Sequence, residues 1–361
     1  MRTLLASHAL RRVLVAVLVM AVAVFVIDLL SGYRQGQVAN IAYLAIAAGG
    51  LTVLTGLNGQ LSLGHGAFMA VGAYTTALLL QDGRETSVLV LLVAAVIVSV
   101  VIGLVVGLAA ARLHGPYVAG ATLALAVALP SLATHFRGTL GGEPGLRVRS
   151  PEVPKLVDDG LFFLTGTDTG TTQWMATLAV GCLVITFLLL RNLGESRVGR
   201  RWRAVRDDPV AAQLAGIDLG RNRVGCFVVS AACAGLAGSL MAMITRIAAP
   251  TGFTIVLSLT LLMAVVLGGL GTLTGALIGA ALLTLLPGYV TNLGSSMGLS
   301  DLQSAELAPL VLGLTTMAVV LLAPSGLVGT IIRAYRQRRT PIAPPTPRTA
   351  APQGTTLEET S

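Results

Sequence analysis

Polar side chains gather in one otherwise apolar stretch, G-L-N-G-Q-L-S-L-G-H-G-A-F at residues 56–68. They are Asn58, Gln60, Ser62 and His65, and each can form hydrogen bonds with a polar solute or with other groups of the protein. Exposing such groups to lipid is costly, so we expect them to face a bundle interior or a water-lined cavity. The neighbouring glycines favour a broken helix that lines a path through a membrane, and tight packing is the alternative interpretation.

His65 could in principle carry a proton, although a single histidine within a span more often forms a packing hydrogen bond. Asp28 and Glu306 lie near the ends of apolar segments, and no Asp, Glu or Lys lies near the centre of one. Proton- and sodium-coupled transport usually depends on such a central ionisable group. The sequence therefore disfavours an ion-coupled mechanism.

Catalytic and metal-binding patterns do not emerge from the sequence. The single lysine, Lys155, follows a proline, so the chain lacks the G-x-x-x-x-G-K-[ST] loop that binds nucleotide phosphates. Cys182, Cys226 and Cys233 lie in apolar segments without C-x-x-C spacing and are interpreted as small hydrophobic residues. We expect no catalytic residues, no metal site and no cofactor, and therefore no enzyme activity.

A second glycine-rich stretch, L-G-G-L-G-T-L-T-G-A-L-I-G-A, covers residues 267–280. Gly271, Gly275 and Gly279 repeat every four residues, which is the pattern of membrane helices that approach each other closely. We interpret them as helix-packing residues, and a broken segment is an equally open alternative.

A polar loop at residues 191–223 separates two apolar segments and carries eight arginines. Within it, Asp208 can cap a helix, Pro209 suits the first helical position and Gly216 suits a left-handed end. One face of the resulting short helix would hold Val210, Ala211, Leu214 and Ala215. A helix of about two turns is marginal alone in water, so we expect it to dock into a partner. An ordinary positively charged loop is the alternative.

The positions of these motifs are set by a strongly apolar chain, with 54% hydrophobic and 11% charged residues. This composition predicts an all-α polytopic membrane protein with about 8–10 transmembrane helices, including glycine-rich broken segments. The net charge of +8 reflects arginines beside the spans and does not indicate nucleic-acid binding. The predicted apolar segments are 12–30, 38–56, 61–80, 87–111, 117–136, 173–190, 224–245, 255–269, 272–292 and 307–323.

Basic residues predict the orientation of these segments. With the N-terminus inside, seventeen of the 24 Lys and Arg residues fall on the cytoplasmic side, so both termini are placed there. Residues 1–339 then form the transmembrane domain, with an external loop at 137–172 and a cytoplasmic loop at 191–223. The first span is expected to stay uncleaved. The Pro- and Thr-rich residues 340–361 are expected to be a disordered cytoplasmic tail.

In this order, the motifs resemble the membrane permease subunits of branched-chain amino acid ABC importers, of the larger of the two permease types. The match includes the two glycine-rich stretches, G-P-Y-V-A-G-A-T-L-A at 115–124, A-V-R-D-D-P-V-A-A-Q-L-A-G-I at 204–217 and P-S-G-L-V-G at 324–329. The resemblance covers nearly the whole chain except the tail. It implies an ABC importer permease fold in a bacterial inner (plasma) membrane.

The resemblance also implies that residues 204–217 couple the permease to a cytoplasmic ATPase subunit. Ala211, Ala212 and Gly216 match the A-A-x-x-x-G core of the importer motif, while Val210 stands where many importers have Glu. The implied coupling residues are Arg206, Asp207, Asp208, Pro209, Ala211, Ala212 and Gly216. ATP-driven closure of the ATPase dimer would then re-orient two paired permeases in alternating access.

The implied partners are ATPase subunits, a second permease subunit, membrane lipid and an external binding protein that delivers the amino acid to the 137–172 loop. The family commonly has T-G-G-x-x-G-L in that loop, and this chain departs from it at Leu140. Pairing with the same or a different permease is left open. The alternatives are a urea or short-chain amide importer, an ion-coupled secondary transporter, and a structural or scaffolding membrane protein.

Overall fold

The computed structural model describes residues 2–81, 86–113, 116–155, 158–160, 162, 169–323 and 326–330. The predicted tail at 340–361 lies outside these residues. Ten helices correspond to the ten predicted apolar segments: α1 (Arg2–Asp28), α2 (Gly32–Leu51), α3 (His65–Leu79), α4 (Val88–Ala111), α5 (Pro116–His135), α8 (Thr171–Glu195), α11 (Leu219–Thr245), α12 (Ile255–Gly268), α13 (Leu273–Ser296) and α14 (Asp301–Leu322). Within the described residues, eight stretches are long and apolar enough to cross a membrane. The predicted all-α polytopic class is confirmed.

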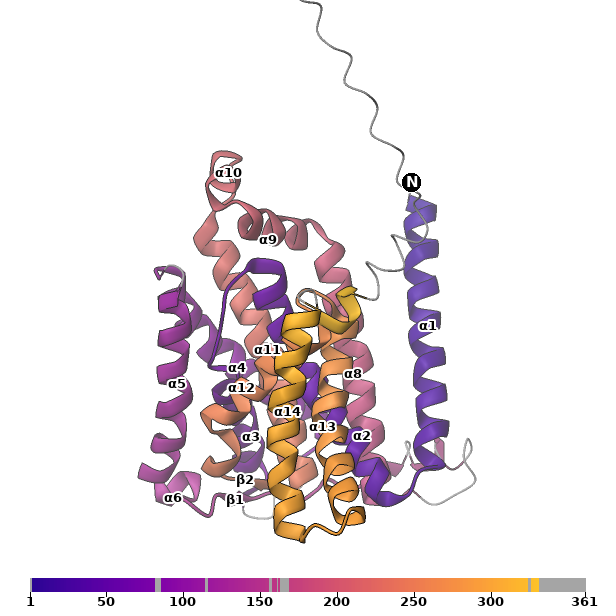
Figure 1. Ribbon diagram of the computed structural model, residues 1–361. Coiled ribbons are helices and arrows are strands. Elements are labelled where there is room, and N and C mark those ends of the chain that lie inside the picture. The colour runs from indigo at the N-terminus through magenta and orange to yellow at the C-terminus, as the bar shows by residue number, and fades with distance from the viewer. Residues whose placement is uncertain are drawn as a thin grey trace, which may run out of the picture.

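The bundle has two distinct ends (Figure 1). Short helices α9 (Arg197–Asp207) and α10 (Pro209–Leu214) lie at one end, together with the start of α1. We call this the α10 end. Helix α6 (Arg137–Leu140) and strands β1 (Leu146–Arg147) and β2 (Ile247–Ala248) lie at the other, the β end. The strands pair antiparallel, with Leu146 opposite Ala248, and join the 137–172 loop to the end of α11.

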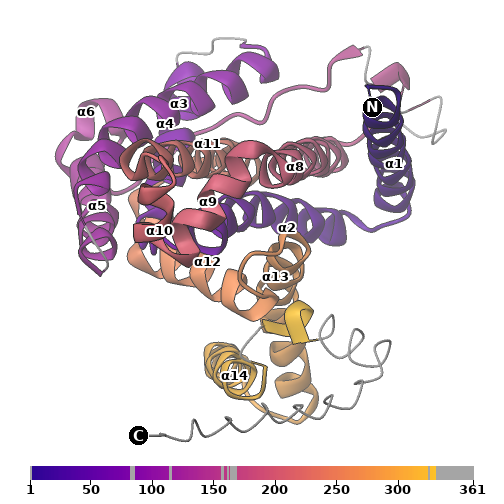
Figure 2. The ribbon, with the colours of Figure 1, turned by 90° about the horizontal axis from the view of Figure 1, so that it is seen from above.

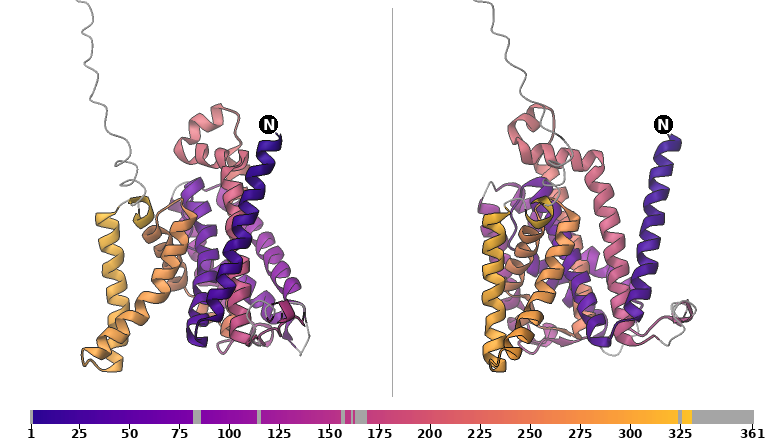
Figure 3. Two further views of the ribbon diagram at one scale, coloured as in Figure 1. Left: turned by 90° about the vertical axis from the view of Figure 1, so that its right-hand side faces the viewer. Right: turned by 45° about the vertical axis from the view of Figure 1, so that its right-hand side comes forward.

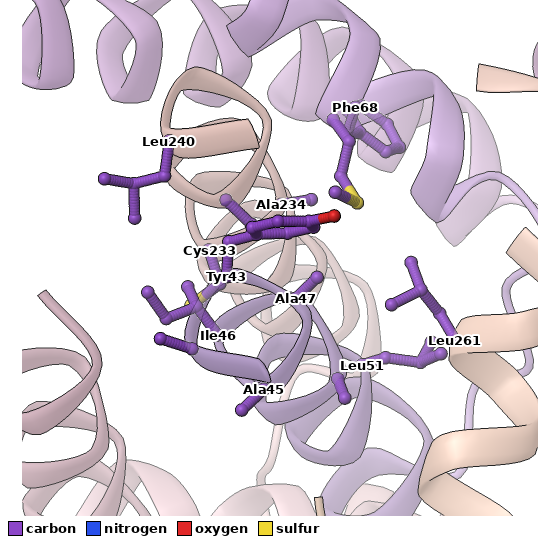
Figure 4. Packing of buried hydrophobic residues seen from close by; sticks show 14 of the residues in the cluster. Tyr43, Ala45, Ile46, Ala47, Leu51, Phe68, Cys233, Ala234, Leu240 and Leu261 are labelled. Atoms are coloured by element: carbon purple, nitrogen blue, oxygen red, sulfur yellow. The ribbon is translucent and has the colours of Figure 1, made fainter. Parts of the chain in front are cut away.

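The core forms around α11, which packs against α4, α3 and α2. Small residues permit this packing: a Cβ on Gly235 would overlap Ser99 of α4, and one on Gly238 would overlap the carbonyl of Met69 in α3. Buried side chains of α2, α3, α11 and α12 fill the space between these helices (Figure 4). Close approach through small residues is how membrane helices gain contact area, because lipid offers little hydrophobic driving force.

Two helices lie at the periphery of the bundle, on different sides of it. Helix α1 packs chiefly on α8, and α14 packs chiefly on α13 (Figures 2 and 3). Both expose many large apolar side chains, such as Leu18 of α1 and Leu314 of α14. Because an apolar surface is favourable in lipid, this exposure agrees with a membrane-embedded bundle.

The two glycine-rich stretches fall on three of the predicted apolar segments, 61–80, 255–269 and 272–292, and the helices formed there differ in length. Helix α3 has 15 residues, which at 1.5 Å each span about 22 Å, less than the ~30 Å hydrocarbon core of a bilayer. Helix α12 has 14 residues, but together with the preceding residues 250–254 it forms a 19-residue apolar stretch that is long enough to cross a membrane. Helix α13 continues over 24 residues despite Pro287, so it is no half-helix. Of these three helices, α3 alone therefore has the length of a broken span.

Candidate functional site

The break between α2 and α3 has a defined backbone structure. Helix α2 continues into a π-helical turn, η1 (Thr52–Leu57), and the chain reverses at Gly59, whose φ is +76°. The backbone amide of Gln60 donates to the carbonyl of Leu54 (3.2 Å), and the Thr55 hydroxyl donates to the backbone carbonyl of Gln60 (3.2 Å). The chain then runs irregularly until α3 begins at His65. We call residues 56–64 the broken segment.

The structure buries Asn58, Gln60, Ser62 and His65, with exposed fractions between 1% and 8%. The Gln60 side-chain amide donates to Asn58 Oδ1 (2.7 Å) and to the carbonyl of Arg223 in α11 (3.3 Å). Ser62 Oγ accepts a long bond from the amide of Gly64 (3.4 Å). Among the described residues, none bonds to Asn58 Nδ2. The broken segment is thus tied to α11 and retains an unpaired polar group inside the bundle.

His65 joins three helices through one serine. Ser230 Oγ of α11 lies 3.0 Å from His65 Nε2 and donates to the carbonyl of Gly50 in α2 (2.8 Å). Because the serine proton is used in the second bond, His65 Nε2 must carry the hydrogen of the first. No described residue bonds to Nδ1. This geometry gives the histidine a packing role between α2, α3 and α11.

Two hydroxyl residues that hold the start of α3 were not singled out in the sequence. Thr122 Oγ1 of α5 accepts from the amide of Leu63 (3.0 Å), and Ser258 Oγ of α12 accepts from the amide of Gly66 (2.9 Å). Serine and threonine in a membrane helix commonly bond their own preceding turn, as Thr122 also does with Val118. Their presence in an apolar segment therefore carries no distinguishing signal.

The second glycine-rich stretch meets the first. Gly271 lies in the turn between α12 and α13 with φ of +85°, and a Cβ on Gly56 would overlap its backbone. Gly275 and Gly279 lie on α13, where a Cβ would overlap the carbonyls of Gly268 and Ala264 in α12. The three glycines therefore do not form one helix stripe: two lie between α12 and α13, and Gly271 abuts the broken segment.

The polar loop folds into two helices. In α10, Asp208 Oδ1 accepts from the amides of Val210 (2.9 Å) and Ala211 (3.0 Å), and Pro209 is the first helical residue. Gly216 has φ of +78°, as expected for a left-handed end. The Ile217 amide closes the end by bonding the carbonyl of Ala212 (3.0 Å). These local predictions are confirmed.

Helix α9, which the sequence analysis did not separate from the loop, supports α10. Ser196 caps it, and its Trp202 and Val205 are buried against the bundle. Helix α10 projects beyond the bundle (Figure 1), and only Ala212 of its residues is buried. Val210 and Leu214 are 69% and 86% exposed. An apolar helix face thus points away from the membrane bundle.

Arg206 connects these two regions. It is the penultimate residue of α9, and its Nη1 donates to the carbonyl of Gly56 in the broken segment. Its Nε and Nη2 donate to Asp207 Oδ1 (2.9 and 2.7 Å). A Cβ on Gly59 would lie 2.9 Å from Arg206 Cγ, so glycine is required for this contact. The structure therefore places the α9–α10 junction directly on the broken segment.

The β end carries the glycine motif of the 137–172 loop. Gly141, Gly142 and Gly145 all have positive φ, and a Cβ on Gly145 would overlap residues 248–249. Ser150 Oγ donates to the carbonyl of Met243 (3.0 Å) and accepts from Arg246 Nε (3.1 Å). The described part of this loop is thus held against the end of α11.

Two cavities, of about 570 and 760 Å³, open on the surface. The smaller lies between α4, α8 and residues 149–154 at the β end, and the larger lies between α1, α8 and α13. None of Asn58, Gln60, Ser62 and His65 lines either of them. In this conformation these four polar side chains are packed within the bundle.

Comparison with known proteins places these features in a family. The family described as "Branched-chain amino acid transport system / permease component" matches residues 35–320. The chain is 30% identical over 265 residues to the high-affinity branched-chain amino acid transport system permease protein LivM of Salmonella typhimurium, covering 68% of this chain and 61% of that protein. It is 30% identical over 288 residues to LivM of Escherichia coli K12, covering 75% and 66%.

A shorter relative is covered more completely. The chain is 27% identical over 297 residues to the permease protein LivH of Salmonella typhimurium, covering 79% of this chain and 91% of that protein. The match to the two LivM proteins spans just under two thirds of their length. No solved structure matches the chain. The resemblance seen in the motifs is confirmed, and the chain belongs to the family of branched-chain amino acid transport system permease components.

Proposed function

We propose that the chain is the permease subunit of an ATP-driven ABC importer for branched-chain or other hydrophobic amino acids. The observation that carries this proposal is α10, a capped helix whose exposed face includes Val210 and Leu214. Exposing such side chains to water is unfavourable by about 25 cal/mol per Å² of apolar surface. The face therefore suits a socket in a soluble subunit, which is what an ATPase that drives a permease must provide.

Coupling then passes from α10 to the broken segment through Arg206. The contact of its guanidinium with the Gly56 carbonyl joins the α9–α10 junction to the end of η1. The Gln60 side chain binds the carbonyl of Arg223 near the start of α11, so the broken segment is also linked to α11. A displacement of α10 would therefore move the broken segment and α11 together. Asn58, Gln60, Ser62 and His65 are proposed to line the path when the bundle opens.

The α10 end is proposed to face the cytoplasm, with both termini on that side. Six arginines of α9 and its flanks, from residue 191 to residue 206, lie there, as the positive-inside rule requires. The β end would then face outward and receive substrate from a binding protein. In this proposal, ATP is hydrolysed by the partner subunits, a second permease completes the path, and the membrane is a bacterial inner membrane.

Purification of the tagged chain from native membranes tests the proposal. We expect ATPase subunits and a second permease to co-purify, and a binding protein loaded with leucine, isoleucine or valine to stimulate ATP hydrolysis. Stimulation only by a urea- or amide-loaded binding protein would replace the proposed substrate. Transport by the isolated chain on an ion gradient, without ATP, would overturn the proposed mechanism.

A further inference from the structure

The groove of about 760 Å³ between α1, α8 and α13 combines two different surfaces. Its walls are apolar, with Val15 and Val19 from α1, Val184 from α8 and Leu277 from α13. Three arginines, Arg11, Arg12 and Arg191, line the part nearest the α10 end. Figure 2 shows α1 standing apart from α13, with α8 next to α1 and α2 next to α13.

The charges in this part of the groove do not balance. Arg12 donates to Asn192 Oδ1 (2.8 Å) and pairs with Glu195 Oε2, and Arg191 pairs with Glu195 Oε1 (3.2 Å). One carboxylate therefore serves two guanidinium groups. Among the described residues, Arg11 has no hydrogen-bond or ion-pair partner. Three guanidinium groups and one carboxylate leave an excess of positive charge beside an apolar groove.

A ligand that satisfies both surfaces needs an anionic head and apolar chains. A free inorganic anion would leave the apolar walls uncovered. A membrane helix of another protein would cover the walls but would have to supply acidic residues at this depth, where they are rare. Basic pockets between membrane helices are suited to phospholipid head groups.

We propose that this groove binds one anionic phospholipid, with its phosphate between Arg11 and Arg191 and its acyl chains along α1 and α13. The lipid would fill the space that separates α1 from α13. In the structure α1 packs chiefly on α8. The bound lipid would add a second attachment of α1 to the bundle, through α13. This inference does not depend on the proposed transport function.

Native mass spectrometry of the purified full-length chain, with its co-purifying subunits, tests the site. The probes are phosphatidylglycerol, phosphatidylcholine and soluble glycerol 3-phosphate. Arg11→Gln is the main variant because it removes no bond within the described structure. We expect phosphatidylglycerol to bind in preference to phosphatidylcholine, and Arg11→Gln to weaken only the former, by about fivefold.

Two further variants separate the head-group site from the groove. Arg201→Gln removes an exposed arginine of α9 outside the groove and should leave binding unchanged. Val184→Trp narrows the groove and should weaken both lipids. Equal binding of the two lipids, an equal loss in Arg201→Gln, or equally tight binding of glycerol 3-phosphate would each overturn the proposal.

Discussion

Arg206 shows how one side chain can join two motifs that are far apart in the sequence. Its guanidinium presents several donors in a fixed plane, so it can bind Asp207 and the Gly56 carbonyl at the same time. Gly59 leaves room for its stem. None of these residues by itself indicates a contact in the sequence. The connection between the α9–α10 junction and the broken segment requires Arg206, Gly56 and Gly59 together.

Replacing Arg206 with Ala should therefore uncouple transport. Hydrogen bonds to charged groups contribute about 1.5–3 kcal/mol, so we expect at least a tenfold fall in the amount of substrate moved per ATP hydrolysed. Arg206→Lys should be nearly as defective, because one ammonium cannot reproduce the planar set of donors. Uptake and ATP hydrolysis are measured together in proteoliposomes.

Arg201→Ala is the matched control for this experiment, because Arg201 is an exposed arginine of the same helix. An unchanged ratio of transport to hydrolysis in Arg206→Ala would show that the contact with Gly56 is only structural.

Gly216 is the second residue whose replacement should impair coupling, because its backbone conformation favours glycine. Its φ of +78° is strained for any β-branched residue, and no atom lies within 4 Å of the position of an added Cβ. The effect of Gly216→Val should therefore come from backbone strain of about 1–3 kcal/mol. We expect normal membrane insertion with strongly reduced ATP-driven uptake, measured in vesicles.

Gly216→Asn provides the comparison, since asparagine adopts the left-handed conformation more readily. It should retain most of the uptake. Normal uptake in Gly216→Val would contradict the proposed role of α10.

At the scale of elements, the broken segment combines polar groups with a short following helix. Replacing Gln60 with Leu removes the bonds to Asn58 and to the carbonyl of Arg223. Replacing Asn58 with Leu removes fewer bonds, because no described residue bonds to Nδ2. Both variants should impair uptake, and Gln60→Leu should also lower stability by about 1–3 kcal/mol.

Thermal unfolding of the purified chain and uptake by the complex are the two measurements. Leu61→Ala alters an exposed side chain of the same segment, so it should change neither the thermal stability nor the uptake strongly. Unchanged uptake in both Leu variants would leave the segment with a packing role alone.

The elements could be predicted from sequence to different degrees. Long apolar runs and the capping residues Asp208 and Gly216 act locally, so the spans and α10 were predictable. The start of α3 depends on hydroxyls from α5 and α12, and the position of Arg206 depends on Gly56, which is 150 residues away. Such contacts are set by the packing of the whole bundle. Helix α9 could not be distinguished from the rest of the loop, because its many arginines outweigh the two buried apolar side chains, Trp202 and Val205, in the sequence pattern.

At the scale of the whole molecule, the two ends differ in chemistry. The α10 end carries the arginine-rich helix α9 and an exposed apolar helix face. The β end carries a glycine-rich loop held by a two-stranded pair. The proposed import mechanism, in which substrate arrives on one side and force on the other, needs this asymmetry. The assignment of sides therefore decides whether α10 can meet a cytoplasmic ATPase.

Cysteine labelling can determine that orientation. Cys226 and Cys233 are buried and Cys182 is half-buried in α8, so the wild-type chain should give a low background with a membrane-impermeant maleimide. We expect Glu143→Cys, exposed at the β end, to be labelled in cells with a permeabilised outer membrane. Leu214→Cys should react only after lysis and removal of peripheral subunits with urea. The reverse pattern would place α10 outside, where no ATPase could reach it, and would overturn the coupling proposal even if uptake depended on ATP.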